Sequence, residues 1–189
     1  CLSYTKNGTT PLVVASQNGH VEVVNVLLNI GKANPNEIST TMKPLYIASV
    51  KGHVEIVRAL LDSGANVDEK HDGTTTPLFV ASHNGFTEVV SSLVKRGRAN
   101  VNLRCGKHKT TPLGIATRQS YLDVIEILLK AGADISEADD DGATPLHIAA
   151  ENGDYDIVNT LLKYDRKHGC VNQMKNKGAS ALYVAAQNG

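Results

Sequence analysis

The chain has 189 residues, of which 19 are basic and 19 acidic, so its formal net charge is zero. A chain without a net field has no general attraction for nucleic acid or for an acidic membrane surface. It contains no tryptophan and only two phenylalanines, and it has no apolar run of about 18 residues that could span a bilayer. Such a composition suits thin layers of Leu, Val, Ile and Ala better than one large aromatic core.

One three-residue motif recurs along the whole chain, each time just before an apolar stretch. In five of its six copies a proline takes the middle position, and these prolines are 33, 33, 35 and 33 residues apart. A fixed period of this length is typical of stacked-repeat proteins, in which each repeat packs only on its neighbours. The copies are Thr10-Pro11-Leu12, Lys43-Pro44-Leu45, Thr76-Pro77-Leu78, Thr111-Pro112-Leu113, Thr144-Pro145-Leu146 and Ser180-Ala181-Leu182.

Each copy of the motif predicts the start of a short inner helix. A threonine precedes the proline in four repeats and can cap the first turn, while proline is tolerated at the first helical position. The helix should end at a glycine, as at Gly19 and Gly52, because glycine readily adopts the left-handed conformation. In the fourth repeat Ser120 takes the place of this glycine, so we expect either a different turn or local strain of about 1 kcal/mol.

A second, outer helix is predicted directly after each of these turns. It carries an early carboxylate such as Glu22 or Asp156, where negative charge suits the helix dipole. Its apolar residues recur at i, i+3 and i+4, on one helical face. Because every repeat carries this stripe, we interpret it as a shared, buried core rather than as a groove for a partner helix. Its members are Val24, Leu27, Leu28, Val57, Leu60, Leu61, Val90, Leu93, Val94, Ile125, Leu128, Leu129, Val158, Leu161 and Leu162.

The gap before the sixth repeat is longer, because Ala181 follows Pro145 by 36 residues. Three extra residues make nearly one helical turn. We therefore expect residues 163–169 to form either an extended outer helix or a longer outer loop. The tips of the repeats should stay in register.

The fifth repeat carries the most complete pattern, Thr144-Pro145-Leu146-His147, and Gly-Ala turns follow two outer helices at Gly64-Ala65-Asn66 and Gly132-Ala133-Asp134. In these motifs the chain resembles the ankyrin-repeat family over essentially its whole length. The resemblance implies a mainly α-helical repeat solenoid of stacked ankyrin repeats. Each repeat would have a β-hairpin tip, two antiparallel helices and a loop.

The repeats are expected to form a single array over residues 1–189. Neither end has the polar outer face of a terminal repeat, so we expect the array to be a fragment of a longer one. Five full repeats and a partial sixth are predicted near residues 6–38, 39–71, 72–106, 107–139, 140–175 and 176–189.

The cysteines and histidines give no sign of a metal centre or a catalytic site. Cys1, Cys105 and Cys170 are an odd number of thiols in different repeats, which favours unbridged cysteines in the reducing cytoplasm or nucleus. Cys105 near His108, and His168 near Cys170, each lack the second pair that a zinc site needs. We expect no metal, no cofactor and no enzymatic activity.

The resemblance implies that a partner binds to the hairpin tips and to the solvent face of the inner helices, which line a concave surface. The residues at these surface positions differ from repeat to repeat, whereas the residues that form the helices and turns recur. The fold therefore does not require particular side chains at the surface positions. A solvated face without any partner remains the alternative. The candidate contact residues are Met42, Tyr46, Val50, Lys51, Asp72, Thr75, Phe79, His83, Asn84, Lys107, His108, Thr110, Arg118, Gln119, Asp140, Asp141 and Glu151.

We expect the centre of this surface in repeats two to four, at Met42, Tyr46, Val50, Phe79, His83 and Arg118. Tyr46 and Phe79 occupy the place that His147 takes in the fifth repeat. At that place an aromatic ring could anchor a partner, or it could be half-buried between repeats.

Charge is patterned although its sum is zero. Residues 95–109 include six basic and no acidic side chains, and residues 134–156 include eight acidic side chains and no Lys or Arg. A partner could feel the two patches separately, because screening acts over about 8 Å at physiological salt.

The sequence thus predicts an intracellular scaffold for protein–protein interaction, monomeric and not inserted in a membrane, that binds a protein or peptide. One alternative is recognition of an anionic ligand or RNA by Lys107, His108, Lys109 and Arg118, whose affinity would fall steeply with salt. Another alternative is an architectural spacer within a long array.

Overall fold

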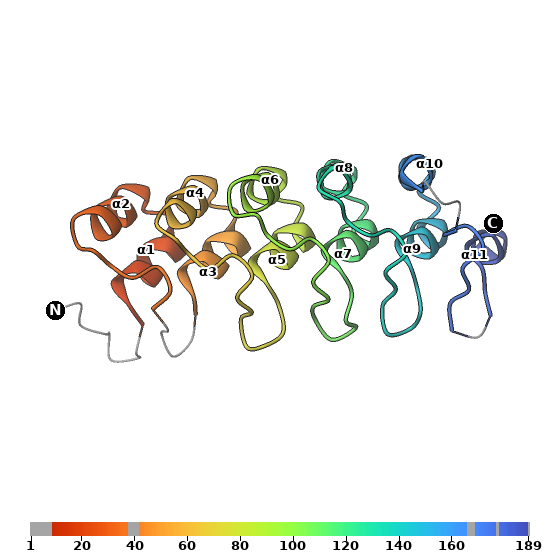
Figure 1. The fold of residues 1–189 in the computed structure, drawn as a ribbon, viewed down its shortest axis with the longest axis horizontal. Helices are drawn as coiled ribbons and strands as arrows, with labels where there is room; N and C mark the ends of the chain where they lie inside the picture. The colour runs from red at the N-terminus through yellow and green to blue at the C-terminus, as the bar shows by residue number, and fades with distance from the viewer. Residues whose placement is uncertain (1–8, 38–41, 166–168, 177, 189) are drawn as a thin grey trace. The chain divides into compact units, whose positions relative to one another are not determined.

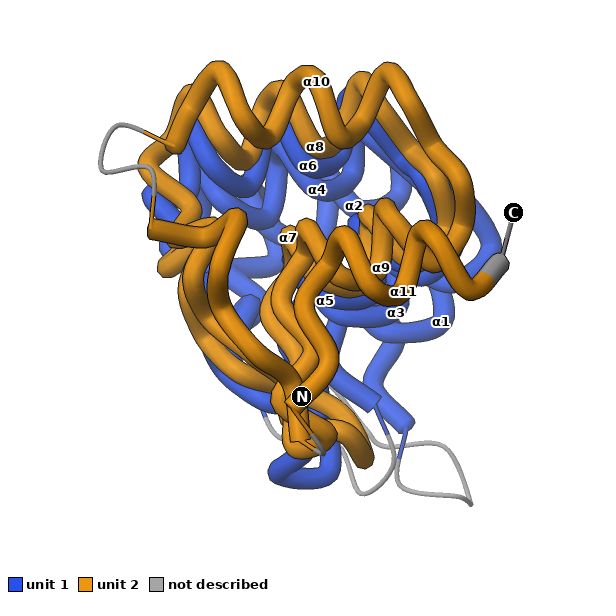
Figure 2. Tube along the Cα trace, turned by 90° about the vertical axis from the view of Figure 1, so that its right-hand side faces the viewer, with its two compact units in different colours: residues 1–99 blue, residues 100–189 orange. Residues whose placement is uncertain are grey.

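The computed structural model describes residues 9–37, 42–165, 169–176 and 178–188. The chain divides into two compact units, residues 1–99 (unit 1) and 100–189 (unit 2), which Figure 2 colours separately. The division falls after the third outer helix, inside the third of the predicted repeats. The six repeat boundaries themselves therefore stay a prediction.

Unit 1 consists of helix pairs (Figure 1). Its inner helices α1, α3 and α5 pack side by side, and so do its outer helices α2, α4 and α6. Each outer helix also packs on the inner helix of its own repeat. In order, these helices are α1 (Pro11–Asn18), α2 (Val21–Asn29), α3 (Pro44–Lys51), α4 (Val54–Asp62), α5 (Pro77–His83) and α6 (Thr87–Lys95).

Unit 2 has the same arrangement and ends on an inner helix. The inner helices α7, α9 and α11 form one row and the outer helices α8 and α10 form another (Figures 1 and 2). The helices are α7 (Pro112–Arg118), α8 (Leu122–Lys130), α9 (Pro145–Asn152), α10 (Tyr155–Tyr164) and α11 (Ala181–Asn188). The predicted class, a mainly helical repeat solenoid, is confirmed.

The caps explain why each inner helix begins and ends where it does. The hydroxyl oxygens of Thr10, Thr76, Thr111 and Thr144 each accept a hydrogen bond from the amide three residues later, at 3.1–3.5 Å. At the other end Gly19 and Gly52 have φ of 75° and 74°, and Ser120 has φ of 59°. The local strain expected at Ser120 is confirmed, because a residue with a Cβ adopts this conformation only at a cost.

Most of the predicted apolar stripe of the outer helices is buried in the core, but Leu27, Leu61, Val94 and Val158 are only half-buried. Val57, Leu60, Leu93 and Leu128 are fully buried, but Leu162 on α10 is 40% exposed, so the prediction of its burial was wrong. Burial of this position depends on a following outer helix, and α10 is the last outer helix in the part of the chain that the structure describes.

The tips of the third, fourth and sixth repeats are tight turns, each closed by a single bridge between described residues. Antiparallel bridges join His71 to Thr75, Cys105 to Thr110 and Met174 to Ser180. Such turns are too short to bury much surface, so the helices carry the core.

The sixth repeat stays in register with the fifth. The backbone amide of Asn176 donates to the carbonyl of Asp141 at 3.2 Å, and its side-chain Nδ2 donates to the carbonyl of Asp140 at 3.1 Å. The longer gap starts with an extended outer helix, since α10 has 10 residues whereas α8 has 9. Residues 166–168, on which the rest of this prediction falls, lie outside the described residues.

Candidate functional site

In unit 1 the tip of the third repeat is locked to the inner helix of the second by an aromatic contact. The ring of Tyr46 stacks on that of His71, with centroids 4.2 Å apart and an interplanar angle of 22°. The Thr75 hydroxyl donates to the Tyr46 hydroxyl at 3.2 Å, and His71 Nε2 lies 3.0 Å from a carboxylate oxygen of the exposed Asp72. Tyr46 is therefore held in one orientation while part of its ring remains accessible.

Further along α3 and α5, the predicted residues are exposed or half-buried. Val50 follows Tyr46 by four residues and so lies on the same face of α3. Asn84 donates from Nδ2 to the backbone carbonyl of Val50 at 3.3 Å, and Nδ1 of the exposed His83 lies 3.1 Å from the side-chain oxygen Oδ1 of Asn84. The predicted residues of unit 1 that keep accessible surface are Met42, Tyr46, Val50, Lys51, Asp72, Thr75, His83 and Asn84.

Two of the predicted contact residues are buried, so they present little surface to a partner. Phe79 is 8% exposed, so its ring is buried more completely than the half-burial that was the alternative to an anchor. Thr110 is 6% exposed because Gly114, at the equivalent place in the fourth repeat, has no side chain. The Thr110 hydroxyl occupies the space that a Cβ at Gly114 would need.

In unit 2 a buried carboxylate organises the tip of the fifth repeat. The side chain of Asp139 is only 1% exposed, and its Oδ2 accepts from Arg118 Nη2 at 3.0 Å. Its Oδ1 accepts from the amides of Asp141 and Ala143 at 3.0 and 2.9 Å. Part of the Arg118 side chain is exposed, but its guanidinium already forms an ion pair with Asp139.

A second ion pair in unit 2 joins a residue of the basic segment to one of the acidic segment. Arg104 Nη2 lies 3.1 Å from Asp140 Oδ1, and Arg104 Nε donates to the carbonyl of Lys109 at 2.7 Å. Arg104 of the basic segment thus pairs with Asp140 of the acidic segment, whereas Arg118, which pairs with Asp139, lies between the two segments. The expectation that a partner feels the two patches separately stays a prediction. The predicted residues of unit 2 that remain exposed are Lys107, His108, Arg118, Gln119, Asp140, Asp141 and Glu151.

His147 has a structural role in the contact between the fifth and sixth repeats. It is fully buried, with Nδ1 2.8 Å from the Thr144 hydroxyl and Nε2 3.1 Å from the carbonyl of Ala179 in the next repeat. Burial lowers the pKa of this imidazole, because the charged form would lose its hydration. The neutral ring thus joins repeats five and six.

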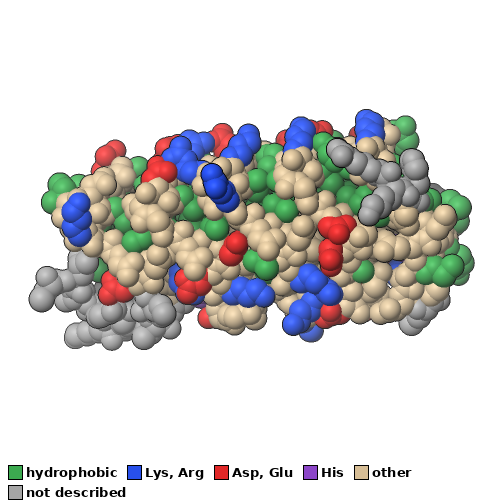
Figure 3. Space-filling view, viewed as in Figure 1, with side chains coloured by type: hydrophobic (Ala, Val, Ile, Leu, Met, Phe, Trp, Pro, Cys, Tyr) green, Lys and Arg blue, Asp and Glu red, His purple; other side chains and the backbone are tan. Residues whose placement is uncertain are grey.

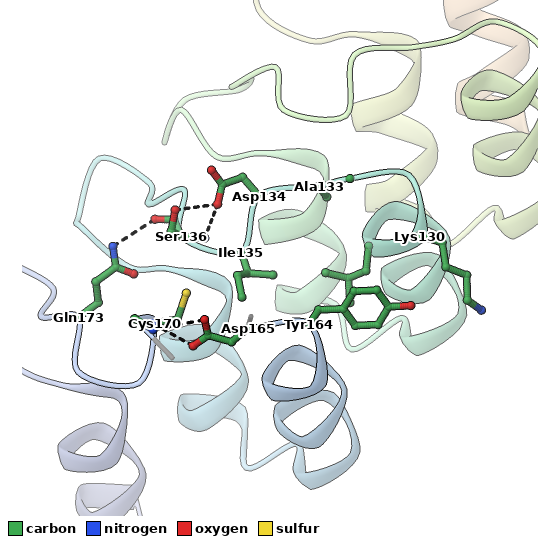
Figure 4. A pocket seen from close by; sticks show the side chains of 12 residues that line it. Lys130, Ala133, Asp134, Ile135, Ser136, Tyr164, Asp165, Cys170 and Gln173 are labelled. Carbon is green, nitrogen blue, oxygen red and sulfur yellow. Dashed lines mark hydrogen bonds between the residues drawn. The ribbon is translucent and has the colours of Figure 1, made fainter. Parts of the chain in front are cut away.

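Unit 2 also has an open cavity of about 650 Å³ beside the end of α10 (Figure 4). Asp165 accepts there from the amides of Gly169 and Cys170 at 3.3 and 3.0 Å, and Gln173 donates to the carbonyl of Ser136 at 3.5 Å. Burial raises the pKa of the Cys170 thiol, and the Asp165 carboxylate raises it further. A protonated thiol is a poor nucleophile, so we interpret Asp165, Cys170 and Gln173 as structural residues.

Two residues that organise the tips were missing from the predicted surface, and local signals could have found them. His71 precedes Asp72-Gly73, a dipeptide typical of tight turns that bring the flanking residues together. Asp139 lies three residues before Gly142, where a carboxylate commonly accepts hydrogen bonds from the turn that follows.

Within the described ranges, no group of three or more His, Cys, Asp or Glu side chains could hold a metal ion. None of the helices in these ranges is long and apolar enough to cross a bilayer. Cys105 and Cys170 are buried and form no disulfide, while Cys1 and His168 lie outside the described residues.

Comparison with known proteins identifies the repeat. A family model described as ankyrin repeats, in three copies, matches residues 2–71, 67–139 and 131–189. Together these matches cover nearly the whole chain. A search of curated proteins gives no match.

Proposed function

The chain belongs to the ankyrin-repeat family, and on that premise we propose that it is an intracellular scaffold that binds a partner protein or peptide. Ankyrin repeats are generally modules of protein–protein interaction, and the family is typically non-enzymatic and common in intracellular proteins. The buried, unbridged thiols of Cys105 and Cys170 suit a reducing compartment. We expect the chain to be a monomer.

The proposed contact surface in unit 1 consists of Met42, Tyr46, Val50, Lys51 and His83. The observation that carries this assignment is the fixed, half-buried ring of Tyr46, held by its stack on His71. A side chain that is ordered before binding loses little conformational entropy when a partner arrives. Interface energy is commonly concentrated in a few such aromatic anchors.

Recognition of an anionic ligand or RNA in unit 2 is the weaker alternative. Of the four side chains it would use, Arg118 is already paired with the buried Asp139. A bound phosphate would have to compete with that carboxylate. Lys107, His108 and Lys109 are exposed, but three side chains on one tip without an aromatic stacking platform make a poor site for nucleic acid.

The test compares two sets of exposed positions on unit 1. A partner captured with the 189-residue chain is purified, and its affinity is measured for the variant Met42→Ala/Val50→Ala/His83→Ala. We expect binding to weaken by more than about tenfold, because truncating a central anchor commonly costs at least about 2 kcal/mol. The melting temperature should change by only a few degrees, since none of the three side chains is fully buried.

The matched control is Lys95→Ala/Arg98→Ala, which removes two exposed charges beside the outer helix α6. The control variant should bind as the wild type does. Equal binding by the triple variant, or loss of binding only in the control variant, would move the contact off this surface. A steep fall of affinity with salt would favour the anionic ligand, and the absence of any captured partner would favour the spacer.

A further inference from the structure

Unit 1 has an open groove between its outer helices α2 and α4, with a volume of about 490 Å³. Its lining combines apolar residues, such as Leu28 and Ala59, with polar ones, such as Asn25, Asn29 and Glu55. Charged side chains of both signs lie over the outer helices, along the upper edge of the view in Figure 3. No residue of the proposed contact surface lines this groove, so it is a separate feature of the unit.

Between the next two outer helices, α4 and α6, the equivalent place is filled by Arg58. Its Nε donates to the hydroxyl of Ser92 at 3.3 Å, and its Nη2 lies 3.5 Å from Oε2 of Glu88, both on α6. The residue one repeat before Arg58 is Asn25, whose shorter, uncharged side chain forms no hydrogen bond within the described part of the chain. The bridge that Arg58 makes is therefore absent between α2 and α4.

A second bridge is absent in the same way. Asp62 of α4 forms an ion pair of 2.5 Å with Arg96, at the end of α6. Their equivalents one repeat earlier are Asn29 and Ser63, which carry no charge and have no hydrogen bond to each other. Since the two helices on either side of the groove are both part of unit 1, the groove is open because the side chains between them are short.

The groove nevertheless keeps the carboxylates that its neighbour uses. Glu55 has the position in α4 that Glu88 has in α6. Arg58 engages Oε1 of Glu55, and an arginine also engages Oδ2 of Asp62. Among the described residues, the other oxygen of each carboxylate accepts no hydrogen bond, and a carboxylate can accept several at once. The two arginines are already paired, so they oppose a further cation less than unpaired charges would.

We propose that the groove between α2 and α4 binds an arginine side chain of a partner protein. The guanidinium takes the place that Arg58 has in the next groove and donates to the open oxygen of Glu55, while its aliphatic stem covers Leu28 and Ala59. Arginine fits better than lysine, because its planar fork donates to two acceptors at once, whereas the lysine ammonium is a compact point charge. This interaction surface lies on the outer helices and does not depend on the contact surface proposed for the inner ones.

A single arginine with blocked ends, N-acetyl-argininamide, is a suitable probe. It is titrated into the isotope-labelled 189-residue chain, and the backbone amide signals are followed by NMR spectroscopy. We expect saturable shifts at α2 and α4, with a dissociation constant in the millimolar range because one side chain makes few contacts. The matching lysine compound should bind at least about threefold more weakly.

Two carboxylates at equivalent positions provide a matched pair of variants. Glu55 lines the groove, whereas Glu88 does not, and both side chains are mostly exposed. We expect the probe to bind at least about fivefold more weakly to Glu55→Gln, which loses a charge-assisted hydrogen bond. Binding to Glu88→Gln should stay within about twofold of the wild type.

The variant Asn25→Arg tests the assignment from within the chain. Its new side chain should fill the groove as Arg58 fills the next one, so the saturable shifts caused by the probe should disappear. Asn25→Gln is the control, because it lengthens the side chain without adding a charge, and it should bind the probe within about threefold of the wild type.

Three results would overturn the proposal: no saturable shift at α2 and α4, equal loss of binding in the two carboxylate variants, or unchanged binding by Asn25→Arg. If the lysine compound bound as tightly as the arginine compound, the groove would accept any cation, and the assignment to arginine would be wrong.

Discussion

His71 in unit 1 and Asp139 in unit 2 occupy the same place, six residues before the proline that starts an inner helix. Both close a similar turn, since the amide of His71 donates to the carbonyl of Thr75 at 2.8 Å and the amide of Asp139 donates to that of Ala143 at 3.0 Å. Beyond the turn they differ. His71 stacks on an aromatic ring, whereas Asp139 is buried under an arginine and accepts two amide hydrogen bonds.

The contrast shows which part of a repeat is constrained. Both turns are closed by the same backbone hydrogen bond, but positive φ occurs at Asp72 and Gly73 in unit 1 and at Gly142 in unit 2, and the side chain that begins the turn contacts different neighbours in the two units. In unit 2 Arg104 and Arg118 form ion pairs with Asp140 and Asp139, so less of their charge is available to a ligand. In unit 1 the aromatic contact leaves part of the Tyr46 ring accessible. This difference is why we place the contact surface on unit 1.

The largest expected effect comes from removing the buried carboxylate. Asp139→Ala deprives two backbone amides and Arg118 of their acceptor, and the amides gain no replacement. We expect a loss of about 3 kcal/mol in the free energy of unfolding, measured by urea denaturation. His71→Ala should cost only about 1 kcal/mol, because it removes an aromatic stack and not a buried hydrogen-bond network.

Asp140→Ala serves as the control for charge alone, since its pair with Arg104 is exposed and should contribute less than about 1 kcal/mol. If Asp139→Ala were no more damaging than His71→Ala, the tip of unit 2 would not depend on its carboxylate, and the contrast between the units would fail.

A smaller, pH-dependent effect is expected from His147. Its pKa is lowered in the folded chain, so as the pH falls below about 6.5, the reference value for histidine, the unfolded state takes up a proton first. Stability is therefore fully present above that pH and decreases as the pH falls through the folded pKa. The slope contributed by one group is at most about 1.4 kcal/mol per pH unit.

Urea denaturation at several values between pH 7.5 and pH 5 measures this slope. The variant His147→Gln should show a shallower pH dependence than the wild type, although it is less stable at neutral pH. Unit 1 has Tyr46 and Phe79 at the equivalent places and therefore has no imidazole there. An unchanged slope in His147→Gln would assign the pH dependence to other histidines.

The smallest effect concerns the turn between inner and outer helices. Ser120 in unit 2 has φ of 59° where Gly52 in unit 1 has φ of 74°. Ser120→Gly should stabilise the chain by about 0.5 kcal/mol in thermal or urea unfolding, since relief of the left-handed strain exceeds the loss of an exposed hydrogen bond to Asp154.

The reverse change in unit 1 should be more harmful. A Cβ at Gly52 would lie 3.0 Å from the ring of Phe86, so Gly52→Ala combines backbone strain with crowding and should cost about 1–2 kcal/mol. Equal and opposite effects at the two sites would mean that crowding by Phe86 contributes nothing.

The fold could be predicted from the sequence because its determinants are local. Thr144 and Pro145 start α9 through a side-chain cap and a fixed φ, and the stripe of Ile125, Leu128 and Leu129 follows the period of a helix. Neither depends on which repeat comes next. The surface could not be predicted as well, because accessibility depends on neighbours that are distant in sequence. Phe79 and Tyr46 share a position, yet the first is buried and the second is half-exposed.

The sequence by itself determined the period, the helix starts and ends, and the family, because backbone conformation and helical periodicity are set within about ten residues. Only the tertiary structure decided that Arg118 is paired with Asp139, that Thr110 fills the space left by Gly114, and that Leu162 is exposed. Each of these outcomes depends on side chains of another helix or turn, and burial and charge pairing are properties of that contact rather than of either segment.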